Sequence, residues 1–137
     1  MSRPYTQTID ILRAAGLRPT RQRVGLSYIL FNGGDRHVTA DQLHSEADAA
    51  GLKVSLATVY NTLHQLCDAG LLAEVLVEPG RSYFDTNISV HHHFFNMDTG
   101  ELADIPPDEI SVQQLPTPPE GTAIDQVSII VRVRQNP

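Results

Sequence analysis

The sequence predicts an α+β fold, with helices in the first half of the chain and strands in the second. Two observations support this prediction. Before residue 70, apolar residues recur at helical spacing and a glycine ends each such segment, whereas strand-like runs flanked by turn residues follow residue 70. At 137 residues, the chain is long enough to bury a core as one domain or as two very small ones.

Three short helices are expected before residue 52. The first carries apolar residues at helical spacing and ends at Gly16. The second begins after Thr20, which can cap it, and ends at residues 32–34, which read Asn-Gly-Gly. The third begins with the capping-box pattern Thr-Ala-Asp-Gln at residues 39–42, and Gly51 ends it.

A fourth helix has the clearest signals. Ser55 can cap its start, and Gly70 stands in the position that commonly follows a helix. Its apolar face consists of Leu56, Val59, Leu63, Leu66 and Cys67. Its other face consists of Ala57, Asn61, His64 and Gln65. The pattern therefore predicts an amphipathic helix with a polar face available to a partner.

A β-hairpin is expected after the fourth helix. Residues 72–77 and 82–86 read as strands, and between them Pro79 and Gly80 suit the two central positions of a type II turn. Helices followed by a hairpin form the element order of a winged helix-turn-helix, in which the last helix enters the major groove of DNA. Any small helical domain with an attached hairpin is the alternative. The prediction is a winged helix-turn-helix DNA-binding domain over residues 1–86.

The second half is predicted to form a small α/β domain over residues 87–137. Residues 94–97 and 101–105 form a second hairpin around Asp98-Thr99-Gly100, and five of the nine prolines lie in residues 106–119. Apolar residues then alternate with polar ones over residues 127–134. This last strand offers an edge that a second copy of the chain can extend or cover.

Charge is distributed unevenly along the chain. The net charge is −6, but residues 1–70 hold seven basic and six acidic groups, whereas residues 71–137 hold three and ten. Within residues 1–34, five arginines accompany one aspartate. This local basic patch is suited to meet phosphates, although the whole chain is acidic.

Cysteine content and hydropathy limit the class of protein. The one cysteine, Cys67, excludes an internal disulfide framework and a multi-cysteine metal site. The first ten residues contain no apolar run typical of a signal peptide, and no stretch approaches the roughly 18 apolar residues of a membrane span. We therefore expect a soluble, cytoplasmic protein.

The predicted DNA contacts lie on the fourth helix and in the basic patch. Amide side chains such as Asn61 can make a bidentate pair with adenine, and Thr58 and Tyr60 can contact thymine methyl groups. Basic side chains suit phosphates or the minor groove. The full predicted set is Arg18, Arg21, Arg23, Lys53, Ser55, Thr58, Tyr60 and Asn61. A solvated helix face is the alternative interpretation of the same residues.

Three consecutive histidines form a candidate metal site. On a strand, His91 and His93 point to one face and His92 to the other, so the first and third form a ready bidentate ligand. With a nearby carboxylate such as Asp85, and His37 as a more distant ligand, the set suits Zn²⁺, Fe²⁺ or Mn²⁺. Exposed hydrogen-bonding histidines at a domain junction are the alternative.

One further motif permits an enzymatic interpretation. Asp98-Thr99-Gly100 matches the triplet of homodimeric aspartic proteases, in which two chains each contribute one carboxylate to a shared-proton pair. A tight hairpin turn also favours Asp and Gly for backbone reasons. Because nothing else marks a general base or a substrate pocket, we expect a protein that is not an enzyme and keep the protease as the alternative.

Four segments together resemble the ferric uptake regulator family, and more closely its iron response regulator branch. They are LRPTRQRV (17–24), HVTADQL (37–43), VSLATVYNTLHQLCDAGLL (54–72) and GRSYFDTNISVHHHFF (80–95). The resemblance implies a homodimeric transcriptional repressor of iron and haem homeostasis genes, with a winged helix joined by a hinge to a C-terminal α/β dimerisation domain. It also implies a regulatory metal at the hinge, with ligands that fall here on His37, Asp85, His91 and His93.

The chain departs from the family pattern at three places. The paired cysteines of the family's structural zinc site are absent, so no such site is expected. Val90 and Gln126 stand where histidines of a second family site are usual. Asn61 replaces an arginine that is common on the recognition helix, which implies a different operator. Asparagine at this position resembles the iron response branch.

The iron response branch also implies haem as a second candidate cofactor. The resemblance places haem at the histidine run, His91, His92 and His93. The Cys-Pro element of some members is absent from this chain. In the wider family metal promotes DNA binding, whereas in this branch the protein acts when iron is scarce and haem releases it. The resemblance favours the second mode of regulation, in which haem releases the protein from DNA.

Overall fold

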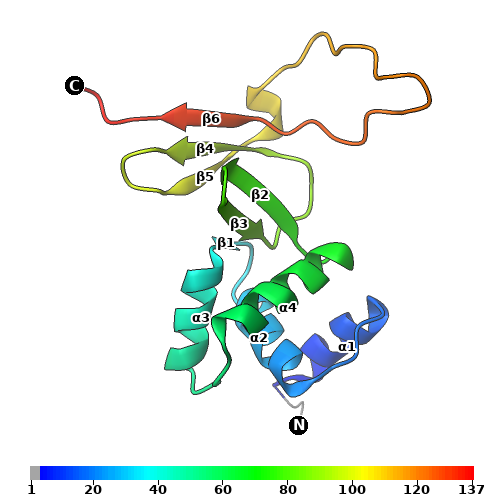
Figure 1. Ribbon diagram of the computed structural model, residues 1–137, viewed down its shortest axis with the longest axis vertical. Coiled ribbons are helices and arrows are strands. Elements are labelled where there is room, and N and C mark those ends of the chain that lie inside the picture. The colour runs from blue at the N-terminus through cyan, green and yellow to red at the C-terminus, as the bar shows by residue number, and fades with distance from the viewer. Residues whose placement is uncertain (1–3) are drawn as a thin grey trace. The chain divides into compact units, whose positions relative to one another are not determined.

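The computed structural model describes residues 4–137 and confirms the α+β arrangement, with helices first and most strands after them (Figure 1). The helices are α1 (Thr6–Ala14), α2 (Arg21–Phe31), α3 (Ala40–Ala49) and α4 (Leu56–Asp68), with a 3₁₀ helix η1 (Pro107–Glu109). The strands are β1 (His37–Val38), β2 (Ala73–Glu78), β3 (Arg81–Asp85), β4 (His92–Asn96), β5 (Leu102–Ile105) and β6 (Ile130–Val133). The chain divides into two compact units, the first ending at Ile88 and the second beginning at Ser89.

Side-chain caps set the starts of three helices in the first unit. Thr20 Oγ1 accepts a hydrogen bond from the Arg23 amide at 3.3 Å, and Ser55 Oγ accepts one from the Thr58 amide at 3.1 Å. At α3, Thr39 Oγ1 accepts from the Gln42 amide at 3.1 Å, and Gln42 Oε1 accepts from the Thr39 amide at 2.8 Å. The capping box predicted from the sequence is therefore confirmed, and it satisfies amides that the helix itself leaves unpaired.

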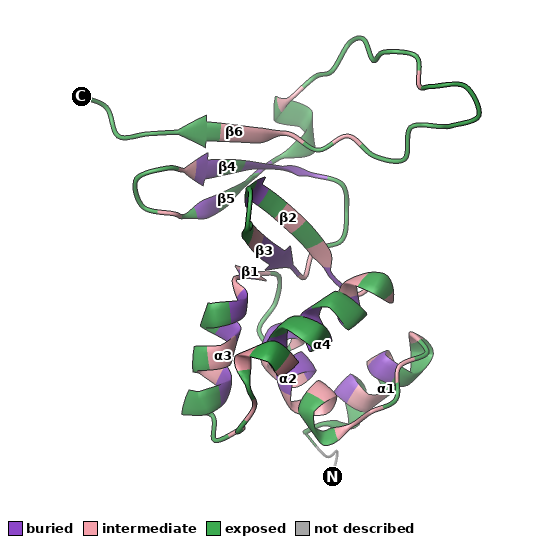
Figure 2. Ribbon diagram, viewed as in Figure 1, coloured by how far each residue is buried: buried purple, intermediate pink, exposed green. Residues whose placement is uncertain are grey.

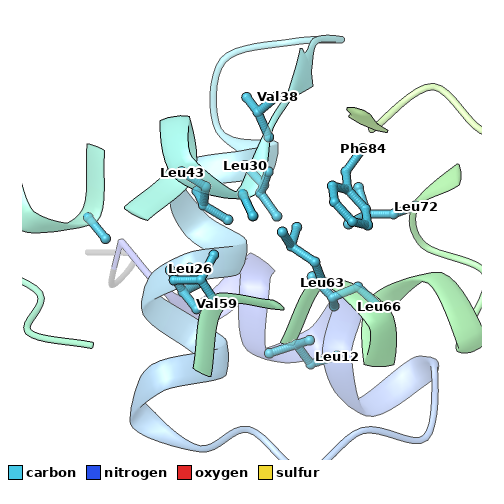
Figure 3. Packing of buried hydrophobic residues seen from close by; sticks show 12 residues of the cluster. Leu12, Leu26, Leu30, Val38, Leu43, Val59, Leu63, Leu66, Leu72 and Phe84 are labelled. Carbon is cyan, nitrogen blue, oxygen red and sulfur yellow. The ribbon is translucent and has the colours of Figure 1, made fainter. Parts of the chain in front are cut away.

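The core of the first unit is built from the apolar faces of all four helices and from two strands. Figure 3 shows Leu26 and Leu30 of α2, Leu43 of α3 and Leu63 of α4 pointing toward one another, with Phe84 of β3 beside them. On α4, Val59, Leu63 and Leu66 of the predicted apolar face are buried, whereas Leu56 and Cys67 are only partly buried; Figure 2 shows the burial along this helix. Burying side chains of this size stabilises a fold by about 1.5–3 kcal/mol each.

A three-stranded antiparallel sheet, ordered β1-β3-β2, completes the first unit. The predicted turn at Pro79-Gly80 joins β2 to β3, and Gly80 adopts a φ of +75°, as the third position of a type II turn requires. β1 was not predicted, because a two-residue strand has no periodicity to detect. Its pairing sets His37 opposite Asp85 and Val38 opposite Phe84.

The second unit is a three-stranded sheet ordered β5-β4-β6 (Figure 1). The predicted hairpin is present as β4 and β5, although β4 begins at His92, two residues before the predicted start. β6 pairs with β4 in parallel, with Phe94 opposite Val131. Between β5 and β6, in the described chain, the only helical segment is η1.

The strand predicted over residues 127–134 is too long. Regular strand structure covers Ile130–Val133 alone, and each of these residues pairs with a residue of β4. Val127 and Ile129 continue the alternation in sequence but precede the paired stretch. Alternating apolar and polar residues suit a strand with one buried face, but a strand also needs a neighbouring strand to which its backbone can hydrogen-bond.

None of the helices in residues 4–137 combines the length and the apolarity of a membrane-spanning helix.

Candidate metal site and nucleic-acid interface

In the second unit, two histidines and one aspartate converge on a single point. His91 Nε2 lies 3.3 Å from Asp104 Oδ1, and His93 Nε2 lies 3.4 Å from the same oxygen. The two imidazole rings are 4.5 Å apart between centroids. The ligand atoms of the three residues all lie within 4.8 Å of one another. His91 and His93 therefore share a face, as strand alternation predicts.

The hydrogen bond at the back of His91 determines which of its nitrogens faces the carboxylate. His91 Nδ1 lies 2.7 Å from the Ser89 carbonyl oxygen, which accepts only, so Nδ1 carries the hydrogen and donates it. In the neutral imidazole, Nε2 then presents a lone pair toward Asp104. Two lone pairs at this distance repel unless a proton or a cation lies between them. A divalent metal ion fits this donor set of imidazole nitrogens and carboxylate oxygen.

His92 has a different environment from its two neighbours. Its Nδ1 accepts a hydrogen bond from the Ile129 amide at 3.0 Å, at the residue that precedes β6. His92 therefore links β4 to the chain segment that enters the last strand. The structure brings together His91 and His93 on Asp104 and gives His92 a separate partner.

The other two predicted metal ligands lie side by side in the first unit. His37 of β1 pairs with Asp85 of β3 in the antiparallel register. Next to them, the Arg36 amide donates to Thr86 Oγ1 and the Thr86 amide donates to the Arg36 carbonyl oxygen, each at 2.9 Å. These bonds extend the β1–β3 pairing by one residue on each strand. His37 and Asp85 are thus held on neighbouring strands.

An ion pair anchors β1 to α3. Arg36 donates two parallel hydrogen bonds to the Glu46 carboxylate, at 2.8 and 2.7 Å. The hydrogen bond to Glu46 raises the pKa of Arg36, while partial burial acts in the opposite direction. A bidentate pair of this kind fixes orientation as well as distance. It therefore holds the strand that carries His37 in a defined position against the helix.

Asp104 was not named from the sequence, although a signal for it existed. In the β4–β5 hairpin, Phe95 pairs with Leu102 and His93 pairs with Asp104. Once the turn at residues 98–100 is assumed, counting outward along both strands reaches this pair. The register of the second hairpin thus places a carboxylate opposite His93.

The recognition face predicted on α4 is exposed. Tyr60 has 42% of its surface in solvent, and Asn61 is also exposed. Ser55 and Thr58 lie at the start of α4, where the Ser55 hydroxyl donates to Thr58 Oγ1 at 2.9 Å in addition to capping the helix. These two residues therefore have a structural role whether or not they contact DNA.

The predicted phosphate contacts fall into two groups. Arg18 and Arg21 are exposed at the turn into α2. Arg23 is committed to neighbours, because its Nε donates to Gln65 Oε1 at 3.1 Å and one terminal nitrogen donates to the Arg18 carbonyl oxygen at 3.0 Å. Lys53 pairs with Asp48 at 3.1 Å, with both side chains largely in solvent. Arg23 therefore links α2 to α4.

His64, on the predicted polar face of α4, makes several contacts within the first unit. Its ring stacks on Tyr60 with centroids 6.5 Å apart and meets Phe84 edge to face at 5.7 Å. Its Nδ1 lies 3.8 Å from Glu74 Oε1, and Glu74 accepts a hydrogen bond from the Ser82 hydroxyl at 2.6 Å. His64 thus connects the exposed Tyr60 to the hairpin. The helical spacing of Tyr60 and His64 was the signal in the sequence.

The triplet Asp98-Thr99-Gly100 forms the hairpin turn between β4 and β5. Asn96 Oδ1 accepts hydrogen bonds from the amides of Asp98 and Thr99, at 2.9 and 3.1 Å. Asp98 Oδ2 in turn accepts from the Gln135 amide at 2.6 Å. The Asp98 carboxylate therefore secures the chain after β6, which is a structural role for the residue that suggested a protease.

Comparison with known proteins identifies the family. The model of the ferric uptake regulator family matches residues 14–132. The ferric uptake regulation protein of Shigella flexneri is 34% identical over 110 residues, which cover 80% of this chain and 74% of that protein. The same protein of Escherichia coli K12 is 33% identical over 110 residues, with the same coverage of 80% and 74%.

Solved structures agree with the sequence comparison. The ferric uptake regulator of Pseudomonas aeruginosa with manganese has a TM-score of 0.72 at 29% identity, covering 93% of this chain and 97% of that one. The ferric uptake regulator of Vibrio cholerae has a TM-score of 0.74 at 25% identity, covering 93% and 99%. The chain belongs to the ferric uptake regulator family.

Proposed function

We propose that this protein is an iron-responsive transcriptional repressor that binds operator DNA as a homodimer in the cytoplasm. Its family consists of transcription regulators rather than enzymes, which supports the proposal. The observation that carries it is the exposed polar face of α4 in a capped helical unit that ends in a hairpin. In a winged helix, that face enters the major groove. The proposed DNA-binding domain covers residues 1–86 and the dimerisation domain residues 87–137.

The proposed regulatory ligand is a divalent metal ion, Fe²⁺, Mn²⁺ or Zn²⁺. His91 and His93 supply imidazole nitrogens beside the Asp104 carboxylate, and His37 and Asp85 complete the proposed set. All five donors are nitrogen or oxygen, as these ions accept. Manganese in the Pseudomonas aeruginosa regulator supports Mn²⁺ as the first ion to test.

A ligand set drawn from both units gives metal binding a means to control DNA binding. An ion that bonds to donors of both units favours the arrangements that bring those donors within coordination distance. If those arrangements differ from the others in their affinity for DNA, then metal and DNA affinities are coupled, and each ligand changes the affinity for the other by the same factor.

On DNA, the proposed contacts divide by role. Asn61 reads a base edge, and Thr58 and Tyr60 contact thymine methyl groups. Arg18, Arg21 and Lys53 bind phosphates, which makes affinity fall with salt. Arg23 acts by joining α2 to Gln65 of the recognition helix. Ser55 orients the first turn of α4 through its cap.

The finer proposal places the protein in the iron response branch of the family. Asn61 and the histidine run support this assignment, and haem is the second candidate cofactor. Neutral imidazole at His91, His92 or His93 is a suitable axial ligand for haem iron. In this version the repressor acts when iron is scarce and haem releases it from DNA.

Fluorescence anisotropy with DNA from upstream of the protein's own gene tests these proposals. The titration is run with a chelator, with Mn²⁺ or Fe²⁺, and with haem, for the unmodified chain, for His91→Ala/His93→Ala and for His44→Gln as a matched control. His44 is suitable because it belongs to α3 of the first unit, where its Nε2 lies 3.0 Å from the Val54 carbonyl oxygen.

The outcomes separate the versions of the proposal. Release by haem that is lost in the double variant supports the iron response branch. Binding promoted by metal alone, and lost in the double variant, supports a metal-activated repressor and removes haem. If no DNA from the regulatory region binds better than unrelated DNA under any condition, the proposed function is wrong.

A further inference from the structure

The first unit contains a cavity of about 590 Å³ beside α2. Its walls come from three places: the start of α1, one side of α2, and the turn that follows α3. The lining residues are Tyr5, Ile9, Arg21, Val24, Gly25, Tyr28, Ile29, Ala50, Gly51 and Leu52. Ligand pockets in proteins typically have volumes of roughly 300–1,000 Å³. The cavity therefore has the size of a small-molecule site.

The residues of α2 that line the cavity lie on one face of the helix. Positions 21, 24, 25, 28 and 29 follow the spacing of one helix face, and Val24, Tyr28 and Ile29 are only partly buried. The fully buried residues of α2, Leu26, Ser27 and Leu30, lie on another face. Val24 and Ile29 also pack against the core cluster, although they are only partly buried. The second apolar face of α2 is thus covered only in part by other side chains of the unit.

Gly25 shapes the floor of this cavity. A Cβ at position 25 would lie 2.6 Å from Leu52 Cδ2, so the missing side chain allows Leu52 to pack directly against the backbone of α2. A glycine inside a helix is unfavourable on its own. The close approach that it permits brings Leu52 against α2, where it lines the cavity.

Polar groups lie at the rim of the apolar walls. Within residues 4–137, the Arg21 guanidinium makes no hydrogen bond or ion pair. Next to it, a smaller hollow of about 130 Å³ is lined by Arg21, Gln22, Gly51, Leu52 and Lys53 and shares three of these residues with the cavity. Tyr5 and Tyr28 meet edge to face with centroids 5.0 Å apart. One end of the site is therefore cationic, and the body is apolar.

We propose that this cavity binds an amphipathic carboxylate, with its carboxylate on Arg21 and its apolar chain along Val24, Tyr28 and Ile29. The planar guanidinium matches a carboxylate through two parallel hydrogen bonds, and Arg21 has no competing partner among the described residues. Lys53 adds positive charge at the same end, although it also pairs with Asp48. The chain of the ligand covers the second apolar face of α2.

Calorimetry with decanoate, kept below its micelle concentration, tests the site on the full chain. Arg21→Gln removes the charge, and Arg13→Gln is the matched control, since Arg13 is an exposed arginine of α1 that does not line the cavity. Ala50→Phe fills the apolar part from an exposed wall position. Decan-1-ol has the alkyl chain of decanoate without its charge, and inorganic phosphate has negative charge without an alkyl chain, so the two probes measure these contributions separately.

One decanoate per chain is expected. Arg21→Gln should weaken binding at least tenfold, Arg13→Gln should change it less than twofold, and Ala50→Phe should abolish it. Absence of saturable binding, several decanoates per chain, or equal affinity in the two arginine variants overturns the proposal. The proposal is also wrong if decan-1-ol binds as tightly as decanoate, because the carboxylate would then contribute nothing. It is likewise wrong if phosphate binding depends on Arg21 and is unchanged in Ala50→Phe, because Arg21 would then bind any anion.

An effect on DNA binding rests on the proposed function as well as on the cavity. Arg21 is a proposed phosphate contact, so an occupied cavity should lower DNA affinity by competing for its guanidinium. A chain that binds decanoate but no DNA contradicts the proposed function and is consistent with the carboxylate site. A chain that binds DNA but no decanoate contradicts the carboxylate site and is consistent with the proposed function.

Discussion

The two units differ in how much of their buried interior is histidine. The first unit encloses leucine, valine and phenylalanine side chains contributed by four capped helices and a sheet. In the second unit, His91, His92 and His93 are buried as well as the apolar Phe95, Leu102 and Ile105, and the regular structure consists of three short strands and one 3₁₀ turn. The difference teaches that the first unit is specified by apolar packing and local signals, whereas the second depends on polar groups that need particular partners.

The largest effect is expected from the core of the first unit. Leu63 is fully buried between α4 and its neighbours, so Leu63→Ala should lower the free energy of unfolding by about 2–5 kcal/mol through lost burial and a residual cavity. Urea denaturation followed by circular dichroism measures the change. Leu76→Ala is the control, because Leu76 is 61% exposed and should cost little. Equal losses in both variants would contradict the assigned core.

The second unit should respond to metal rather than to apolar truncation. His91→Ala or Asp104→Asn should weaken Mn²⁺ binding by on the order of 100-fold, since each removes a proposed ligand from a small set. His92→Ala is the matched control and should leave affinity nearly unchanged, because His92 bonds to the Ile129 amide. Calorimetric titration distinguishes them. A His92→Ala variant as weak as His91→Ala would mean that the cluster is wrongly assigned.

DNA binding should separate base reading from phosphate contact within the first unit. Asn61→Ala should weaken binding to the operator by about 1–3 kcal/mol, with little effect on unrelated DNA. Lys53→Gln should weaken both and reduce the slope of affinity against salt by about 1. Anisotropy titrations at several salt concentrations measure both quantities. Identical behaviour of the two variants would remove Asn61 from base recognition.

A single cap tests how far local signals specify the first unit. Thr39→Ala removes both the hydroxyl that accepts from Gln42 and the reciprocal geometry of the capping box. It should lower the free energy of unfolding by about 1 kcal/mol. Thr117→Ala is the control, since Thr117 is exposed and its hydroxyl makes no hydrogen bond within residues 4–137. The shift in the urea midpoint should be confined to Thr39→Ala.

The smallest effect concerns the cysteine. Burial raises the pKa of the Cys67 thiol to about 11 from its ordinary value of 9.0, with Glu74 and Asp68 adding to the shift. The folded chain therefore favours the protonated thiol, and this contribution to stability is present below pH 9 and is lost as pH rises toward 11. Iodoacetamide should modify Cys67 much more slowly than glutathione at pH 8. Rapid modification of the folded protein at that pH would contradict the shift.

The helices, their caps and both hairpins were predictable because each signal lies within a few residues of sequence. Thr20, Thr39 and Ser55 all cap as expected. β1 and the role of Asp104 were missed, because both depend on a register between segments that are distant in sequence or on opposite sides of a turn. The length of β6 was overestimated, since alternation does not reveal where the partner strand ends.

The parallel pairing of β4 with β6 also orders events during synthesis. β6 lies after a connection of more than twenty residues from β5, and its backbone bonds to β4 beside the histidines. The His92 bond to Ile129 likewise needs the end of that connection. While the ribosome is still translating residues 106–129, the first unit already has every residue of its core, and protein domains commonly fold in this order. The pairing of β4 with β6 and the His92 bond to Ile129 can form only after β6 has emerged from the ribosome, so a newly made chain acquires its helical unit before its complete second sheet.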